Sequence, residues 1–203
     1  MTTGLRFMVG PDEKILYQGK PDLKCFVFET IFNPSLPIVI LWGALDLFVL
    51  GNLIFAKGSG KSFFVGFILI HMTPVWIYLS SIIFMARKYR NIEYIVTDKA
   101  IYVSGGVFSR TYRSKPFAEL SHIDLHRSVF DQLFNVGDVI ANTSHIRPNQ
   151  KSATITLNSI LNFTEVYNLI KKLQQDIYTD IMFPNEYRPD VNRGYKTEYK
   201  GFE

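Results

Sequence analysis

The sequence contains a single cysteine, Cys25, among its 203 residues. One thiol excludes an internal disulfide framework and any zinc site built from several cysteines. The nucleophile elbow, the dinucleotide-binding glycine fingerprint and the helical zinc-protease motif are also missing. Gly60-Lys61-Ser62 matches only the end of a P-loop, because Phe55 stands where that motif needs its first glycine. We therefore expect no enzymatic activity and no cofactor.

Charge is scarce in the first half of the chain. The formal net charge is only +4, and no basic run or stripe of the kind that binds nucleic acid is present. Within residues 33–86 the charged side chains are Asp46, Lys57 and Lys61. We therefore expect membrane lipids and proteins as partners, and no nucleic acid.

Two long apolar runs are present instead, over residues 36–56 and 63–86. Each is about as long as the ~20 residues that a helix needs to cross a bilayer. The connection over residues 57–61 is too short to hold a domain. Both runs are longer than a signal-peptide core, and neither has the polar face of a helix buried in a soluble protein. They predict a transmembrane helical hairpin within residues 33–86.

Positive charges flank this hairpin on both sides, at Lys14, Lys20, Lys24, Arg87, Lys88, Arg90 and Lys99. The positive-inside rule then predicts a two-span protein of the cell membrane with both termini in the cytoplasm. Residues 1–32 form a cytoplasmic N-terminal segment in this interpretation. Residues 87–181 form a folded domain, and residues 182–203 form an extended or disordered tail.

The domain after the hairpin shows the pattern of a β-rich fold. Short strands are predicted over residues 92–97, 100–104, 107–113, 121–127, 139–143 and 153–157. Short strands with tight turns predict an antiparallel barrel or sandwich. A helix should follow, because Val166, Leu169, Ile170, Leu173 and Ile177 have helical spacing. One face of that helix must pack on the strands.

The order of these parts resembles the bacterial pleckstrin-homology (PH) domains of small two-pass membrane proteins. The similar segments are Asp12 to Tyr17, Tyr94 to Lys99, Ile101 to Val103, Glu119 to Ile123 and Arg127 to Gly137. The resemblance covers roughly residues 10–180. It implies an α+β membrane protein in which a two-helix hairpin is followed by a PH-like antiparallel β-barrel closed by a C-terminal α-helix. It also implies no enzymatic activity, and some members are linked with envelope stress or resistance to membrane-active peptides.

Asp46 and His71 are the unusual residues of the hairpin. A carboxylate in the middle of a span costs on the order of 2.5–3.5 kcal/mol on insertion scales. In a hairpin centred on Ser59, residues at equal depth have numbers that sum to about 118. Asp46 and His71 fit this rule, so we expect a hydrogen-bonded pair, helped by Asn52. The pair is either a structural clasp between the helices or a proton-sensitive or partner-facing element.

Three other histidine and acidic residues alternate along one predicted strand: His122, Asp124 and His126. Their spacing raises the idea of a zinc site, but neighbours ~6–7 Å apart form a splayed set. The same alternation follows whenever Ile123 and Leu125 face the core. We therefore predict no metal site.

Two surface regions of the domain are candidates for contact with partners. Arg110, Arg113 and Lys115 are candidates for contact with anionic headgroups, or are basic residues that protect a strand edge from aggregation. Phe130, Leu133 and Phe134 lie in an apolar turn with helical spacing. This turn either packs into the core or forms a wedge at an interface.

The sequence thus favours a non-enzymatic integral membrane protein whose cytoplasmic PH-like domain binds a protein partner or self-associates. A homo-oligomer would bury the polar residues of the hairpin. Two alternatives stay open. One is an accessory subunit of a transport or export system that uses Asp46 and His71, and the other is a sensor of anionic lipid surfaces.

Overall fold

A computed structural model of the chain describes residues 4–55, 61–143 and 154–182. It separates into two compact units, one formed by residues 1–26 with 87–203 and the other by residues 27–86. We call these the sheet unit and the helical unit. The predicted N-terminal segment, residues 1–32, is thereby divided between the units. Loop residues 57–60 and the predicted tail from residue 183 onward lie outside the described residues.

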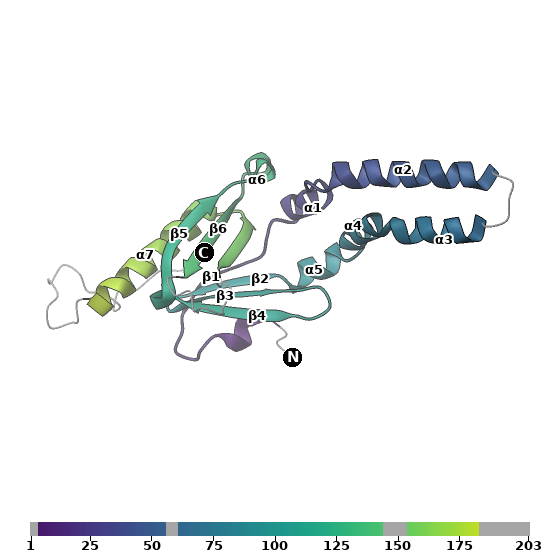
Figure 1. The fold of residues 1–203 in the computed structure, drawn as a ribbon. Coiled ribbons are helices and arrows are strands. Elements are labelled where there is room, and N and C mark those ends of the chain that lie inside the picture. Colours follow the sequence, from purple (N-terminus) through teal and green to yellow (C-terminus); the bar gives the residue numbers. More distant parts are fainter. Residues whose placement is uncertain (1–3, 56–60, 144–153, 183–203) are drawn as a thin grey trace. The chain divides into compact units, whose positions relative to one another are not determined.

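The first sheet of the sheet unit has four antiparallel strands in the order β1-β2-β3-β4 (Figure 1). They are β1 (Ile15–Gly19), β2 (Glu93–Thr97), β3 (Ala100–Gly105) and β4 (Thr111–Pro116). The β1 strand comes from the N-terminal segment and pairs with β2, with Tyr17 opposite Val96. The segment before the apolar helices is therefore an edge strand of this sheet.

Strand β2 is buried at all five positions, because both faces of the sheet are covered. One face contributes Tyr94 and Val96 to the main core. The other face packs beneath a 3-10 helix, η1 (Leu5–Met8), in a second cluster formed by Leu5, Ile95, Ala100 and Tyr102. A strand buried on both faces loses the strict apolar and polar alternation, and β2 shows this in its sequence.

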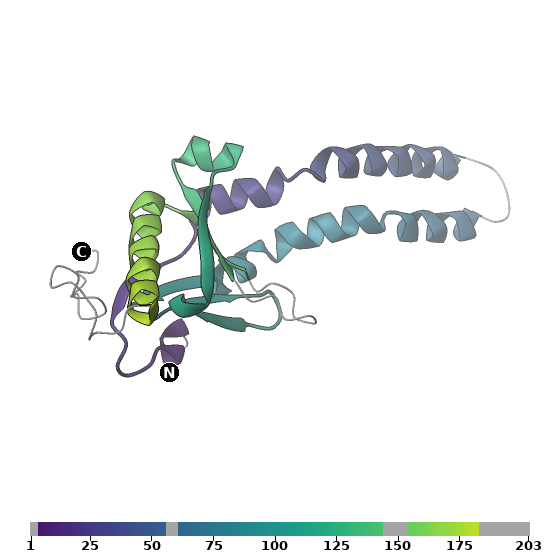
Figure 2. The ribbon, with the colours of Figure 1, turned by 60° about the vertical axis from the view of Figure 1, so that its left-hand side comes forward.

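The second sheet has three antiparallel strands in the order β5-β6-β7. They are β5 (Leu120–His126), β6 (Gly137–Thr143) and β7 (Ile155–Ile160), and the short helix α6 (Val129–Phe134) joins the first two. Helix α7 (Phe163–Met182) packs on β5 and β6 (Figure 2). Val166, Ile170 and Leu173 are its buried face, as their helical spacing predicts.

Both sheets and α7 contribute to one main core, but the sheets do not close into a barrel. Within the described strands, the two sheets share no ladder. The chain leaves the first sheet at Pro116, which has no N–H to donate to a further strand pairing. A 3-10 turn, η2 (Phe117–Glu119), then buries Phe117 in the core before β5 begins. The expected closed barrel is therefore wrong, and two antiparallel sheets replace it.

The helical unit contains α2 (Leu36–Phe55), α3 (Lys61–His71) and α4 (Thr73–Ile83). Helix α1 (Leu23–Ile31) begins in the sheet unit, and α5 (Met85–Asn91) ends in it. In the described part of the chain, one helix, α2, is long and apolar enough to cross a membrane. There are two such segments if α3 and α4 count as one bent span.

The second apolar run is not one continuous helix, because α3 and α4 meet at a bend of 52°. Met72 separates them, and Pro74 lies in the first turn of α4. Proline has no N–H for the helical ladder, and its ring collides with the carbonyl four residues earlier. The hydroxyl of Thr73 instead donates to the carbonyl oxygen of Ile70.

Candidate functional site

The helical unit brings Asp46 of α2 and His71 of α3 together. Oδ1 of Asp46 lies 2.8 Å from Nδ1 of His71, which is hydrogen-bond distance. Asp46 is buried, with 5% of its surface exposed, whereas the His71 side chain is 42% exposed. The antiparallel arrangement of the two helices places these residues opposite each other, as the sum of their residue numbers predicts.

Aromatic rings enclose the imidazole of His71. The ring of Trp42 stacks on it with centroids 4.8 Å apart, and the ring of Phe67 stacks at 5.7 Å. The indole N–H of Trp42 also donates to the backbone carbonyl of His71 at 3.1 Å. These contacts fix the imidazole beside the carboxylate.

The second carboxylate oxygen of Asp46 is also buried. Within the described residues, Oδ2 has no hydrogen-bond partner. Asn52 does not supply one, because its side-chain amide donates to the carbonyl of Phe48 within α2 at 2.7 Å. The expectation that Asn52 supports the pair is therefore wrong. An unsatisfied buried oxygen is costly, so this carboxylate marks a candidate functional position of the helical unit.

The apolar turn between β5 and β6 is helix α6, and its ends are well fixed. Ser128 and Asp131 form a reciprocal capping box at its start, and Asn135 ends it in the left-handed conformation. Phe130 and Phe134 are half-buried, while Leu133 is 69% exposed. The three predicted wedge residues therefore divide between packing and surface. The exposed ridge consists of Val129, which is 79% exposed, and Leu133 one turn later.

Asp131 explains why α6 is rigid. Its carboxylate accepts the Ser128 N–H at 2.8 Å and the Cys25 thiol at 3.4 Å, and it is fully buried. The lone cysteine therefore joins the start of α1 to α6. Asp131 also lies near His126 and Asp138, with ligand atoms within 4.8 Å of one another. Both Asp131 oxygens already accept protein donors, so we assign this cluster a structural role.

The predicted set of His122, Asp124 and His126 is not brought together as one site. Nε2 of His122 lies 3.5 Å from Asp124, whereas Nδ1 of His126 lies 3.8 Å from Asp138 on β6. Burial raises the pKa of Asp138, and the charge of Asp131 raises it further. The Ser159 N–H and His126 oppose this shift and lower the pKa.

The three basic candidates differ in their surroundings. Arg110 precedes β4 and lies 3.4 Å from the carboxylate of Glu93. Lys115 pairs with Glu119 at 3.1 Å. Arg113 is exposed on β4, opposite Val103 of β3. Two of the three side chains already pair with acidic residues. This pairing makes a shared binding site for anionic headgroups less favourable.

Two acidic residues secure the N-terminal segment. The buried carboxylate of Glu93 accepts the Leu5 N–H at 2.8 Å and the Gln18 amide at 2.7 Å. Glu13 accepts the Tyr102 hydroxyl at 2.9 and 3.0 Å. Burial, followed by the hydrogen bond to Glu13, raises the pKa of Tyr102 to about 12.

Comparison with known proteins agrees with this architecture. The profile of the bacterial PH domain matches residues 44–174, which is more than half of the chain. The chain belongs to the bacterial PH domain family. Searches of curated proteins and of solved structures give no match. The matched region of this bacterial PH domain protein starts inside α2 and ends inside α7, so it includes Asp46 and His71.

Membership of this family indicates a module that interacts with proteins or lipids. It does not specify one function, because one fold supports many functions. Sequence reasoning missed several residues that shape this module. Glu93 and Asp131 were not identified, although Ser128-Val129-Phe130-Asp131 has the spacing of a capping box. The partners of Glu93 lie 75 and 88 residues away, and no local pattern predicts such contacts.

Proposed function

We propose that this protein is a non-enzymatic membrane protein whose helical unit crosses the bilayer and presents the PH-like sheet unit for interaction at the cytoplasmic surface. One observation carries the proposal: only 6% of the apolar stretch Leu36–Leu53 of α2 is buried. A core helix of a soluble protein would be covered by its own chain. Phe48 and Leu47 are instead 71% and 59% exposed, and a lipid environment covers such surfaces.

Membrane integration is tested by fractionating cells that express the full chain and washing the membranes with alkaline carbonate. An integral protein stays in the membrane pellet, whereas a peripheral protein is released. A matched pair of variants sharpens the result. Phe48→Lys should reduce the pelleted fraction because a charge at the centre of a span is costly, and Leu161→Lys on the sheet unit should not. Complete release of the unmodified chain would overturn the proposal.

We propose that the exposed ridge of α6 is the part of the sheet unit that contacts a protein, either a partner or a second copy of the chain. Val129 and Leu133 lie one turn apart on a helix fixed at both ends. A photo-reactive residue at Leu133 should cross-link to a protein in native membranes, and Val129→Asp should abolish that product. Labelling of lipid alone from Leu133 would contradict the assignment.

A second candidate function is an accessory role in transport or export. The buried Oδ2 of Asp46, which has no hydrogen-bond partner among the described residues, favours it. Ionisable groups inside a membrane often line a path for protons or ions. In this case Asp46→Asn would abolish flux while the protein still folds and stays in the membrane. Unchanged flux in that variant would reject the transport role.

A further inference from the structure

The two points at which the chain leaves and re-enters the sheet unit are held next to each other. The rings of Phe26, the last residue before the helical unit, and Tyr89 of α5 lie 5.5 Å apart. The hydroxyl of Tyr89 donates to the carbonyl of Pro21 at 3.2 Å. Residues 20–26 and 87–91 therefore lie side by side on one face of the sheet unit.

This face is strongly basic. Residues 20–26 and 87–91 carry one acidic residue, Asp22, whose carboxylate accepts the Cys25 N–H at 2.9 Å. The same residues carry five exposed cations, namely Lys20, Lys24, Arg87, Lys88 and Arg90. We call these five side chains the basic collar. Its charges lie beside the chain segments that connect to the apolar helices.

The turn between β3 and β4, residues 106–110, is fastened to this face. The side-chain amide of Asn91, at the end of α5, donates to the carbonyl of Gly106 at 2.9 Å. Gly106 has φ of +123°, and a Cβ there would lie 2.0 Å from the carbonyl oxygen of Ser109. Arg110 closes the turn through Glu93 and Ser104. The turn therefore has a fixed shape that only glycine permits at residue 106.

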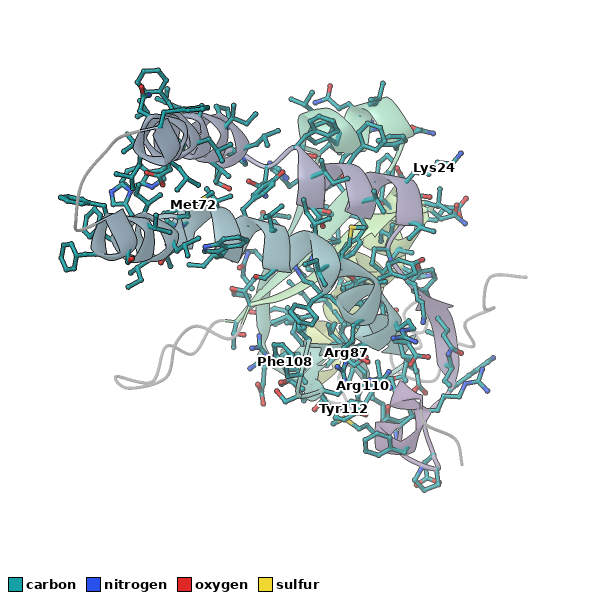
Figure 3. All side chains as sticks on the ribbon, turned by 90° about the vertical axis from the view of Figure 1, so that its right-hand side faces the viewer. Lys24, Met72, Arg87, Phe108, Arg110 and Tyr112 are labelled. Atoms are coloured by element: carbon teal, nitrogen blue, oxygen red, sulfur yellow. The ribbon has the colours of Figure 1, made fainter. Side chains whose placement is uncertain are left out.

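Phe108 is at the tip of this turn and is 76% exposed. The guanidinium of Arg87 lies 6.0 Å from the centre of its ring, and Figure 3 shows the two side chains together on this part of the molecule. The turn is attached at Asn91 and reaches back to Arg87, which is about 6 Å earlier along α5. Phe108 is thereby held beside Arg87, the first residue of the sheet unit after the apolar helices.

We propose that Phe108 and the basic collar bind the anionic leaflet of the membrane that holds the helical unit, with the ring in the interfacial layer and the collar on the headgroups. The inference rests on the proposed membrane anchoring. Aromatic rings favour the interface between headgroups and acyl chains, and basic residues are drawn to anionic headgroups. The two contributions add, because binding at the interface increases with the buried apolar area and with the attraction to anionic lipid.

The test uses the full chain in lipid nanodiscs that contain either anionic or only zwitterionic lipid. Cys25 is replaced by serine, and a nitroxide is attached to Ser109→Cys so that Phe108 stays intact. Accessibility to oxygen and to a water-soluble nickel chelate reports the depth of the label. Labels at Phe48→Cys and Leu161→Cys provide the hydrocarbon and aqueous references.

We expect the label at residue 109 to read an interfacial depth in anionic nanodiscs and to shift toward water in zwitterionic ones. Phe108→Asp and Arg87→Glu should each shift it toward the aqueous reference. Arg113→Glu makes the same charge change outside the collar and should leave the depth of the label unchanged. An equal shift in that variant would contradict the collar and favour the basic residues predicted from the sequence.

Two results would overturn the proposal. The first is an aqueous reading at residue 109 in anionic nanodiscs, and the second is an interfacial reading that does not depend on lipid charge. A failure of the underlying anchoring is distinguishable, because the Phe48→Cys label would then also read as aqueous.

Discussion

Tyr102 joins the first sheet to the segment that precedes the apolar helices. Its hydroxyl donates to both oxygens of Glu13, and Thr97 donates to the same carboxylate at 2.8 Å. Tyr102→Phe removes one bond to a charged acceptor, a loss of about 1.5–3 kcal/mol in the free energy of unfolding. Thr97 keeps the carboxylate partly satisfied, so the variant should still fold. Chemical denaturation of the full chain in detergent measures the difference.

The same tyrosine predicts an alkaline dependence of stability. Its pKa is raised to about 12 in the folded protein, against about 10 in an unfolded chain. The contribution of the neutral phenol is therefore complete below pH 10 and is lost as the pH rises toward 12. Tyr102→Phe should flatten the decrease in stability between pH 10 and 12. An unchanged slope in the variant would assign that decrease to other groups.

The pairing of Asp46 with His71 is testable by a double-mutant cycle. Asp46→Ala, His71→Ala and the double variant are compared by reversible unfolding in SDS. We expect a coupling energy between ~0.6 and ~1.7 kcal/mol, the range of interhelical hydrogen bonds in membranes. Asn52→Ala is the control, because its bond stays within α2, and it should show no coupling to His71→Ala. Simple addition of the Asp46 and His71 effects would contradict a pair.

At this scale the sequence predicted residues whose positions follow from regular geometry. Asp46 and His71 meet because equal depth in an antiparallel hairpin is simple arithmetic on residue numbers. Arg110 illustrates the limit, since its ion pair with Glu93 depends on a turn whose shape is set by Gly106. The predicted strand over residues 107–113 begins only at Thr111 for the same reason.

The elements of the sheet unit pack closely where β6 begins. A Cβ on Gly137 would lie 2.9 Å from Cγ of Phe163, the first residue of α7. The ring of Phe163 has little room to move, because the guanidinium of Arg127 covers it at 4.6 Å. Gly137→Ala should therefore destabilise the fold by about 1–3 kcal/mol, the usual cost of overpacking. Thermal unfolding followed by circular dichroism measures it.

Gly105 provides the matched control for that substitution. It ends β3, and a Cβ there meets no atom within 4 Å. Gly105→Ala should change stability by less than ~1 kcal/mol and can increase it, because alanine restricts the unfolded chain. Equal destabilisation by the two variants would show that contact with Phe163 is not the cause.

Element types were easier to predict than their connections. Helix α7 follows from the spacing of its apolar residues, and most strands follow from alternation. The break at Met72 was missed, although Pro74 signals it, because the run is apolar throughout. The pairing of β1 with β2 joins residues about 80 positions apart across the apolar helices. A local sequence pattern does not reveal such a pairing. It also does not reveal that, among the described strands, the two sheets have no strand pairing with each other.

At the scale of the whole molecule, the two units differ in how far they bury their own apolar side chains. The sheet unit buries a main core shared by two sheets and α7. The helical unit exposes apolar side chains along α2 and buries almost none of them. Because the sheet unit draws β1 from before the apolar helices, the membrane anchoring that we propose requires both of its chain segments to lie on one side of the bilayer. That proposal therefore requires an even number of crossings.

We propose that two membrane crossings place the sheet unit in the cytoplasm. Cysteine accessibility in intact cells tests this topology most directly. Cys25 is fully buried and its thiol donates to Asp131, so a Cys25→Ser background removes the thiol and keeps a hydroxyl donor for that carboxylate. Ser59→Cys marks the connection between the apolar segments, and Ser121→Cys marks an exposed position of the sheet unit. We predict that a membrane-impermeant thiol reagent labels residue 59 in intact cells and residue 121 only after lysis. Labelling of both residues from the same side would contradict the account.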